Sequence, residues 1–249
     1  ASRGIGLAIA QALAATHCMI LTGRDAAVLA AAADALRPGA AAEIHTLSAD
    51  LGPPDARADL IARVQAIADG LGRPVQVLIN NAGLAGSAPL HRSDDAMLAE
   101  LLAINLAAPF ALTRAFVPGM IQAGAGRVIS IASTAALKGY AYTAAYSASK
   151  AGLLGWTRAL AVELAAKAVT VNAVCPGFTD TAIVDRATAQ IAKTTGRSAA
   201  DARTSLAKFS PQGRLRSPAE VAAVVAYLGS PAAAGITGQA LAVDGGETA

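Results

Sequence analysis

The 249-residue sequence has few charged residues. They make up 15% of it, and Lys+Arg exceed Asp+Glu by only 20 to 17, with no run of Lys and Arg. Such a weak positive field argues against nucleic acid or an anionic membrane as a partner. Hydrophobic residues account for 54%, which excludes intrinsic disorder. Because one α/β domain of ordinary size has this length and composition, we expect a single domain over residues 1–249.

Cysteine and histidine are also scarce, and they form no metal or disulfide pattern. Cys18 and Cys175 lie in separate apolar runs without a C-x-x-C spacing, which indicates core thiols in a reducing cytoplasm. His17, His45 and His91 fall in different predicted elements, so we expect no metal site. These residues predict a cytoplasmic protein without a bound metal.

One stretch lacks charge for long enough to cross a bilayer on length alone. No charged residue occurs between Glu220 and Asp244. Glycine and proline at 229–231 and two glycines at 235–238 nevertheless divide it into a helix, a loop and a short strand. We therefore interpret it as a pair of buried elements and expect no membrane association.

Short apolar runs alternate along the chain with longer segments of helical periodicity. The predicted strands are 18–22, 43–47, 75–79, 128–132, 169–174 and 240–243. The predicted helices are 5–15, 25–36, 55–68, 94–123 with interruptions at Pro109 and Pro118, 143–166 and 218–228. This order predicts a Rossmann-type α/β fold, a doubly wound parallel sheet with helices on both faces. Residues 178–216 depart from the alternation, and we expect them to form a substrate lid.

The start of the chain has the composition of a phosphate-binding turn. Gly4 and Gly6 precede an amphipathic helix, where glycines let the backbone approach a pyrophosphate; a simple tight turn fits the pair equally well. Dinucleotide folds place an acidic residue about 20 positions further on to hold the ribose of NAD, but here Arg24 stands there. Together with Arg3 it would pair with a 2′-phosphate, which favours NADP(H). Alternatively, both arginines are solvated and Asp25 binds the ribose of NAD(H).

A tyrosine and a lysine have the spacing of a catalytic pair. Tyr146 and Lys150 are four residues apart on a predicted helix, so both side chains lie on one face. A free tyrosine titrates near pH ~10, and a nearby lysine cation lowers the pKa of its hydroxyl toward neutrality. An ordinary amphipathic helix explains the spacing as well, so the pair needs support from other motifs.

Further motifs follow one another in a fixed order. They are Ser-Arg-Gly-Ile-Gly at 2–6, Asn-Asn-Ala-Gly at 80–83, Asn105, Ser133, Tyr146-Ser-Ala-Ser-Lys150, Pro176-Gly177 and Val243-Asp244-Gly245-Gly246. Thirteen residues separate Ser133 from Tyr146, and 28 separate Asn105 from Ser133. In this combination the chain resembles the short-chain dehydrogenase/reductase family over nearly its whole length.

The resemblance implies catalytic roles for four of these residues. Tyr146 would protonate the carbonyl oxygen as hydride arrives, or act as the base in the reverse direction. Ser133 would donate a hydrogen bond to that oxygen, and Lys150 would bind the nicotinamide ribose and tune Tyr146. Asn105 would hold a water that joins Lys150 to bulk solvent. Alternatively, Asn105 would satisfy the backbone of a helix kink near Pro109.

The resemblance also implies where a cofactor and a substrate bind. The residues expected to bind the cofactor are Ser2, Arg3, Gly4, Ile5, Gly6, Arg24, Asp50, Leu51, Asn81, Ala82, Gly83, Tyr146, Lys150, Pro176, Gly177, Thr179 and Thr181. The substrate wall is expected from 84–92, 137–143 and 183–209. Relatives pair the helices that carry Asn105 and Tyr146 across subunits, which implies a homotetramer.

Within the family the chain is most similar to 3-oxoacyl-thioester reductases and 3-hydroxyacyl-CoA dehydrogenases. We therefore expect an NADP(H)-preferring enzyme that interconverts a ketone and a secondary alcohol, with a 3-oxoacyl/3-hydroxyacyl thioester as the expected substrate. A dehydrogenase of a small cyclic or xenobiotic alcohol is one alternative. A non-catalytic nucleotide-binding sensor is another, but the intact catalytic set argues against it.

Family members have a strand and a Thr-Gly pair immediately before the segment that begins here at Ala1. That strand lies in the middle of the sheet. We therefore expect about a dozen further residues before Ala1, enough for one strand and its turn. Within 1–249, the strands 18–22 and 75–79 are expected to lack their shared partner.

Overall fold

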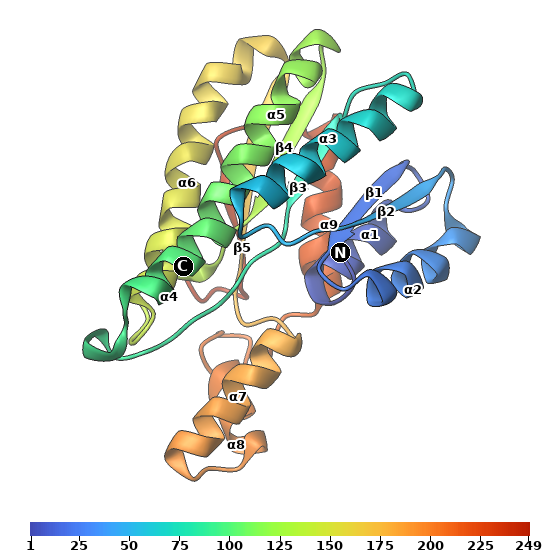
Figure 1. Cartoon of the computed structure of the whole chain (residues 1–249). Helices are drawn as coiled ribbons and strands as arrows, with labels where there is room; N and C mark the ends of the chain where they lie inside the picture. The colour runs from blue at the N-terminus through green and yellow to red at the C-terminus, as the bar shows by residue number, and fades with distance from the viewer.

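The computed structural model describes residues 1–249 and has parallel strands at its centre with helices on both sides (Figure 1). Every strand pair is parallel. One sheet has the order β3-β4-β5-β6, and β1 pairs with β2 in a second sheet. The strands are β1 (Met19–Gly23), β2 (Ile44–Ser48), β3 (Val77–Asn80), β4 (Gly126–Ile131), β5 (Val169–Pro176) and β6 (Ala240–Val243). This confirms the predicted Rossmann-type α/β fold.

Two layers of helices cover the sheets. The helices are α1 (Gly4–Leu13), α2 (Ala26–Leu36), α3 (Pro54–Gly70), α4 (Asp95–Leu102), α5 (Ala108–Gln122), α6 (Ala144–Leu164), α7 (Ala182–Thr195), α8 (Ala199–Ala207) and α9 (Pro218–Gly229). Neighbouring β4 residues point to opposite layers, as the period of a strand requires. Ile129 packs in a core with α1, α2 and α9, whereas Val128 packs in a core with α3, α5 and α6. Burial on both faces explains why the strands are apolar throughout.

The helix predicted over 94–123 differs from the prediction, because it is not interrupted at Pro109 or Pro118. Helices α4 and α5 join through a π-helical turn, Ala103–Ala107, into one segment over Asp95–Gln122. Proline at 109 cannot donate to the carbonyl four residues earlier, and the helix widens before it instead of ending. The Ala103 carbonyl accepts the Ala108 N–H and also the Arg57 guanidinium, at 3.2 Å.

The segment Asp95–Gln122 is long and apolar enough by composition to cross a membrane. It packs against α3 and α6. The uncharged stretch between Glu220 and Asp244 contains α9, a short 3-10 turn and β6, as predicted.

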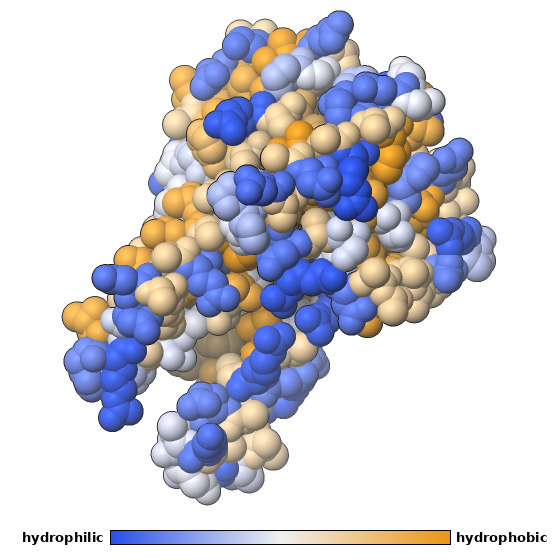
Figure 2. Space-filling view, in the orientation of Figure 1, coloured by the Kyte–Doolittle hydropathy of each residue, from blue (hydrophilic) through white to orange (hydrophobic).

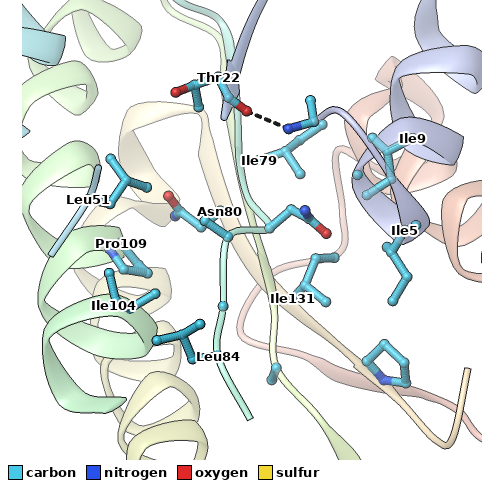
Figure 3. Close-up of a pocket in the computed structure, with 18 of the residues that line it drawn as sticks. Ile5, Ile9, Thr22, Leu51, Ile79, Asn80, Leu84, Ile104, Pro109 and Ile131 are labelled. Atoms are coloured by element: carbon cyan, nitrogen blue, oxygen red, sulfur yellow. Dashed lines mark hydrogen bonds between the residues drawn. The ribbon is translucent and has the colours of Figure 1, made fainter. Parts of the chain in front are cut away.

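β1 and β3 do not hydrogen-bond to each other, so the strands form two sheets. A cavity separates these two edge strands, and Thr22, Ile79 and Asn80 are among the residues that line it (Figure 3). Thr22 Oγ1 and Asn80 Oδ1 are buried without a hydrogen-bond partner.

The segment between β5 and α9 projects from the body of the molecule (Figure 1). Its helices α7 and α8 pack against each other. A parallel bridge between Thr179 and Arg216 closes the base of the projection. Asp180 N–H donates to the Arg216 carbonyl at 2.8 Å, and Arg216 N–H donates to the Phe178 carbonyl at 2.9 Å. Figure 2 shows the surface hollowed between this projection and the body.

Candidate active site

The phosphate turn lies where two other predicted cofactor segments meet it. Gly4 has φ +56°, and a Cβ there would lie 3.2 Å from Thr181 Cγ2. A Cβ on Gly6 would lie 2.6 Å from Asn81 Nδ2, closer than real side chains approach. Only glycine permits both the left-handed backbone and this close approach. The structure therefore brings the turn, the residue after β3 and the residue before α7 together.

Two arginines border the nucleotide end of the cavity: Arg3 directly precedes α1, and Arg24 directly follows β1. Arg3 and Arg24 are exposed and line the cavity, and neither pairs with a carboxylate. Asp25, the alternative ligand for a ribose, does not line the cavity. Its side chain instead caps α2 by accepting the Val28 N–H at 3.0 Å. The two guanidinium groups therefore have no carboxylate partner, and the Asp25 carboxylate is engaged at the start of α2.

Ser133 and Tyr146 meet at the carboxyl end of the central strands. Ser133 follows β4 and accepts the Ala135 N–H at 3.1 Å, which fixes the turn. Burial raises the pKa of Tyr146 above its ordinary value, and a hydrogen bond with Ser133 only partly offsets this. The prediction that the pKa of Tyr146 is lowered is therefore wrong for the chain by itself, where this pKa is raised. Desolvation of the phenolate outweighs the groups around it.

Lys150, one turn further along α6, bonds to the backbone. Its Nζ donates to the Ile131 carbonyl at 2.8 Å, and burial lowers the pKa of the amine to about 8. A Cβ on Gly83 would lie 3.3 Å from Lys150 Nζ and 3.2 Å from Asn105 Oδ1. Residue 83 therefore has to be small for Lys150 and Asn105 to approach the same point.

Asn105 lies behind the cavity in the π-helical turn and is fully buried. Its Oδ1 accepts the Leu84 N–H at 2.8 Å, and its Nδ2 donates to the Leu84 carbonyl at 2.9 Å and to Ser149 Oγ at 3.0 Å. The Ser149 hydroxyl in turn donates to the Tyr146 carbonyl at 2.7 Å. The side chain therefore satisfies the backbone of Leu84, in the loop after β3, and none of its hydrogen bonds goes to the helix near Pro109.

Residues after β6 support the Pro176-Gly177 turn. Gly177 N–H donates to the Val243 carbonyl at 3.1 Å, and a Cβ on Gly177 would lie 3.1 Å from Asp244 Cα. The Asp244 carboxylate accepts the N–H groups of Gly246 at 2.9 Å and Thr248 at 3.0 Å. The sequence motif at 243–246 therefore has a role that its residue types did not indicate, because it packs against a distant turn.

One cavity of about 2350 Å³ contains nearly the whole predicted site. Eighteen of the nineteen predicted cofactor and catalytic residues line it. They are Ser2, Arg3, Gly4, Ile5, Gly6, Arg24, Asp50, Leu51, Asn81, Ala82, Gly83, Ser133, Tyr146, Lys150, Pro176, Gly177, Thr179 and Thr181. Asn105 is the one predicted residue that does not. Sequence reasoning missed Glu247, whose Oε2 would lie 3.0 Å from a Cβ on Gly177.

The comparison with protein families decides what this site belongs to. The family described as short chain dehydrogenase matches residues 1–192. The chain belongs to this family. The match confirms the predicted family and the oxidoreductase class, and it covers all four predicted catalytic residues.

Three relatives show how far the similarity of this short chain dehydrogenase extends. An acetoacetyl-CoA reductase from Rhizobium meliloti is 37% identical over 246 residues, which cover 99% of this chain and 95% of that protein. A galactitol 2-dehydrogenase from Cereibacter sphaeroides is 35% identical over 251 residues, 100% of this chain and 92% of that protein. The crystal structure of an actinorhodin polyketide ketoreductase variant with NADPH has a TM-score of 0.92 and 35% identity, and covers 99% of this chain and 94% of that one.

Proposed function

We propose that this short chain dehydrogenase is an NADP(H)-preferring ketoreductase that interconverts a 3-oxoacyl and a 3-hydroxyacyl thioester. The convergence of Ser133, Tyr146 and Lys150 with the phosphate turn on one cavity is the observation that carries the reaction class. Similarity to an acetoacetyl-CoA reductase over 99% of the chain supports the substrate class. Similarity to an NADPH-bound ketoreductase supports the cofactor.

The residues at the nucleotide end fit a phosphorylated dinucleotide. A side chain on Gly4 or Gly6 would fill the space beside the start of α1, and the N–H groups of a helix start favour a pyrophosphate there. Arg3 and Arg24 would pair with the 2′-phosphate, since no carboxylate neutralises them. Bound NADPH supplies the hydride, and the protein provides position and charge.

The protein's part in the reduction is to hold and protonate the carbonyl oxygen. Ser133 donates a hydrogen bond to that oxygen, which stabilises the charge that develops there. The Tyr146 hydroxyl donates the proton, and its raised pKa keeps it protonated at neutral pH. In the oxidative direction the same hydroxyl receives the proton from the alcohol.

Lys150 and the π-helical turn would return a proton to Tyr146. With its pKa near 8, most of the Lys150 amine is charged at pH 7. Because the Asn105 side chain is engaged by Leu84 and Ser149, the main-chain carbonyl of Asn105 is the acceptor for a connecting water. The donor that an α-helix provides to this carbonyl is absent, since residue 109 is proline.

The projection and the exposed helix faces suggest two further assignments. Residues 178–216 would cover the substrate end of the cavity, because Phe178, Thr181 and Phe209 line it. The helices α5 and α6 would pair between subunits of a homotetramer, since they expose Phe110 to 48% and Val162 to 84%. Light scattering coupled to size-exclusion chromatography tests this, and a monomer would contradict it.

The experiment that tests the function follows NADPH absorbance with acetoacetyl-CoA, a cyclic ketone and a keto sugar. We expect the thioester to have the highest kcat/KM, and Tyr146→Phe to abolish turnover while the Kd for NADPH changes little. Arg24→Asp should shift preference toward NADH. A higher kcat/KM for the keto sugar would favour the second candidate, a polyol dehydrogenase, which similarity to galactitol 2-dehydrogenase supports. Turnover by Tyr146→Phe would refute the mechanism.

A further inference from the structure

Aromatic residues are scarce in this chain, but they gather on one side of the cavity. The sequence has four phenylalanines, four tyrosines and one tryptophan. Five of these nine line the substrate end: Tyr140, Tyr142, Tyr146, Phe178 and Phe209. Tyr146 serves the reaction, whereas the mechanism uses none of the other four.

Three of these rings pack together into a surface that we name the aromatic wall: Tyr140, Phe178 and Phe209. The Tyr140 ring meets Phe178 edge-on at 6.0 Å between centroids and Phe209 at 5.8 Å. The two phenylalanine rings lie 5.3 Å apart. They come from the loop before α6, the turn after β5 and the turn after α8, and Phe209 keeps 46% of its surface exposed. Lys138 Nζ lies 5.1 Å from the Tyr140 ring centroid and 5.9 Å from that of Phe209, so the wall offers the cavity the part of the Phe209 ring that this amine leaves exposed.

A buried carboxylate holds the wall in place. The Glu247 side chain has no exposed surface, and the Tyr140 hydroxyl donates to its Oε1. The same hydroxyl hydrogen-bonds Thr134 Oγ1 at 2.7 Å. Lys138 Nζ lies 3.3 Å from Glu247 Oε1, and it donates to the Glu247 carbonyl at 3.1 Å. Burial, with the Glu247 hydrogen bond second, raises the pKa of Tyr140, so its hydroxyl stays a donor.

The hydrogen bonds of Tyr140 to Thr134 and Glu247 connect the wall to the expected reaction site on two sides. Thr134 is the neighbour of Ser133, which would bind the substrate oxygen. Glu247 Oε2 has no hydrogen-bond partner and lies against Gly177, in the turn expected at the carboxamide. A substrate whose carbonyl reaches Ser133 therefore has the aromatic wall beside the group attached to that carbonyl.

We propose that the aromatic wall selects 3-oxoacyl thioesters whose C3 carbon carries a flat cyclic or aromatic group, and that Glu247 is the positioning residue that holds it. This rests on the proposed ketoreductase function. Rings prefer edge-to-face or offset contacts with other rings, and a rigid group loses less conformational entropy on binding than a straight chain. Because the hydroxyl of Tyr140 is fixed at two points, the wall does not rearrange to follow a flexible chain.

A matched pair of substrates tests this selectivity. The N-acetylcysteamine thioesters of 3-oxo-3-phenylpropanoate and 3-oxo-octanoate differ only in the group on C3. We expect kcat/KM to favour the phenyl compound by about tenfold, roughly what one or two aromatic contacts supply. Phe209→Ala and Glu247→Ala should each reduce this ratio by about fivefold, mainly through KM. Glu247→Gln keeps an acceptor for Tyr140 and should stay within about twofold of the original ratio.

The control is Tyr227→Leu, which removes a half-exposed aromatic ring on α9 that does not line the cavity. It should leave the ratio unchanged. A wild-type ratio of one or less, or an unchanged ratio in both alanine variants, would overturn the proposal. An equal loss for both thioesters together with weaker NADPH binding would show a merely structural role and overturn it too. If the wild type reduced neither thioester, the proposed function would fail and this proposal with it.

Discussion

Replacing Asn105 should destabilise the domain strongly, although the residue lies outside the cavity. Asn105→Ala removes two hydrogen bonds to the Leu84 backbone and one to Ser149, all between 2.8 and 3.0 Å. Each net hydrogen bond contributes about 1 kcal/mol, and the Asn105 side chain is fully buried. We expect a loss of about 3 kcal/mol, which lowers Tm by roughly 6–12 °C in a protein of this size.

Two further variants separate the hydrogen bonds from the loss of volume. Asn105→Asp keeps the shape and the acceptor for the Leu84 N–H but removes the donor to the Leu84 carbonyl and to Ser149. It should therefore destabilise as much as the alanine variant. Ser149→Ala removes one of the three bonds, and a double-mutant cycle with Asn105→Ala should give a coupling energy near ~1 kcal/mol.

Urea unfolding followed by circular dichroism measures these free energies. If Asn105→Ala cost less than about 1 kcal/mol, or if Asn105→Asp were as stable as the wild type, the side chain would not be holding Leu84. The role expected from the family, a water held by the Asn105 side chain, would then regain support.

Three other predictions concern a charge, a turn and a helix start. Lys150→Met should abolish turnover yet stabilise the fold at pH 7. The pKa of Lys150 in the folded protein, about 8, lies below the ordinary 10.5, so the buried charge costs on the order of 3 kcal/mol of folding free energy up to about pH 8. Urea titrations should show that the gain in the variant disappears by about pH 10.5, and equal stability at pH 7 would contradict the prediction. Gly4→Ala strains a residue at φ +56° and places a Cβ 3.2 Å from Thr181, so the Kd for NADPH, measured by fluorescence, should rise about tenfold; unchanged affinity would exclude a close approach there. Glu220→Ala breaks the capping box with Ser217 that starts α9 and should cost about 1 kcal/mol of stability at neutral pH. Hydrogen bonds from Arg214 first, and then from the Ser217 N–H, lower the pKa of Glu220 to about 2. Calorimetry should therefore show that the difference in stability between wild type and variant disappears as the pH falls from about 4.5 toward 2.

Local patterns were sufficient to predict the strands and the chemical identity of the site. The unbroken apolar run at 169–174 predicted β5 because a strand covered on both faces has no polar alternation. The spacing of Tyr146 and Lys150 predicted a shared helix face, and the order of the motifs predicted the family. The strand and the shared helix face depend on neighbouring residues, and the motif order can be read along the chain, so the sequence by itself determined them.

Burial and long-range contacts were decided only by the tertiary structure. The pKa of Tyr146 is raised and not lowered, because desolvation depends on how α6 packs over the strand ends. Asn105 bonds to Leu84, 21 residues away, and Ser149, 44 residues away, because the helix widens before Pro109. Tyr140 and Glu247 are 107 residues apart and share no motif. No periodicity in the sequence predicts such a contact, since only the folded chain brings the two residues together.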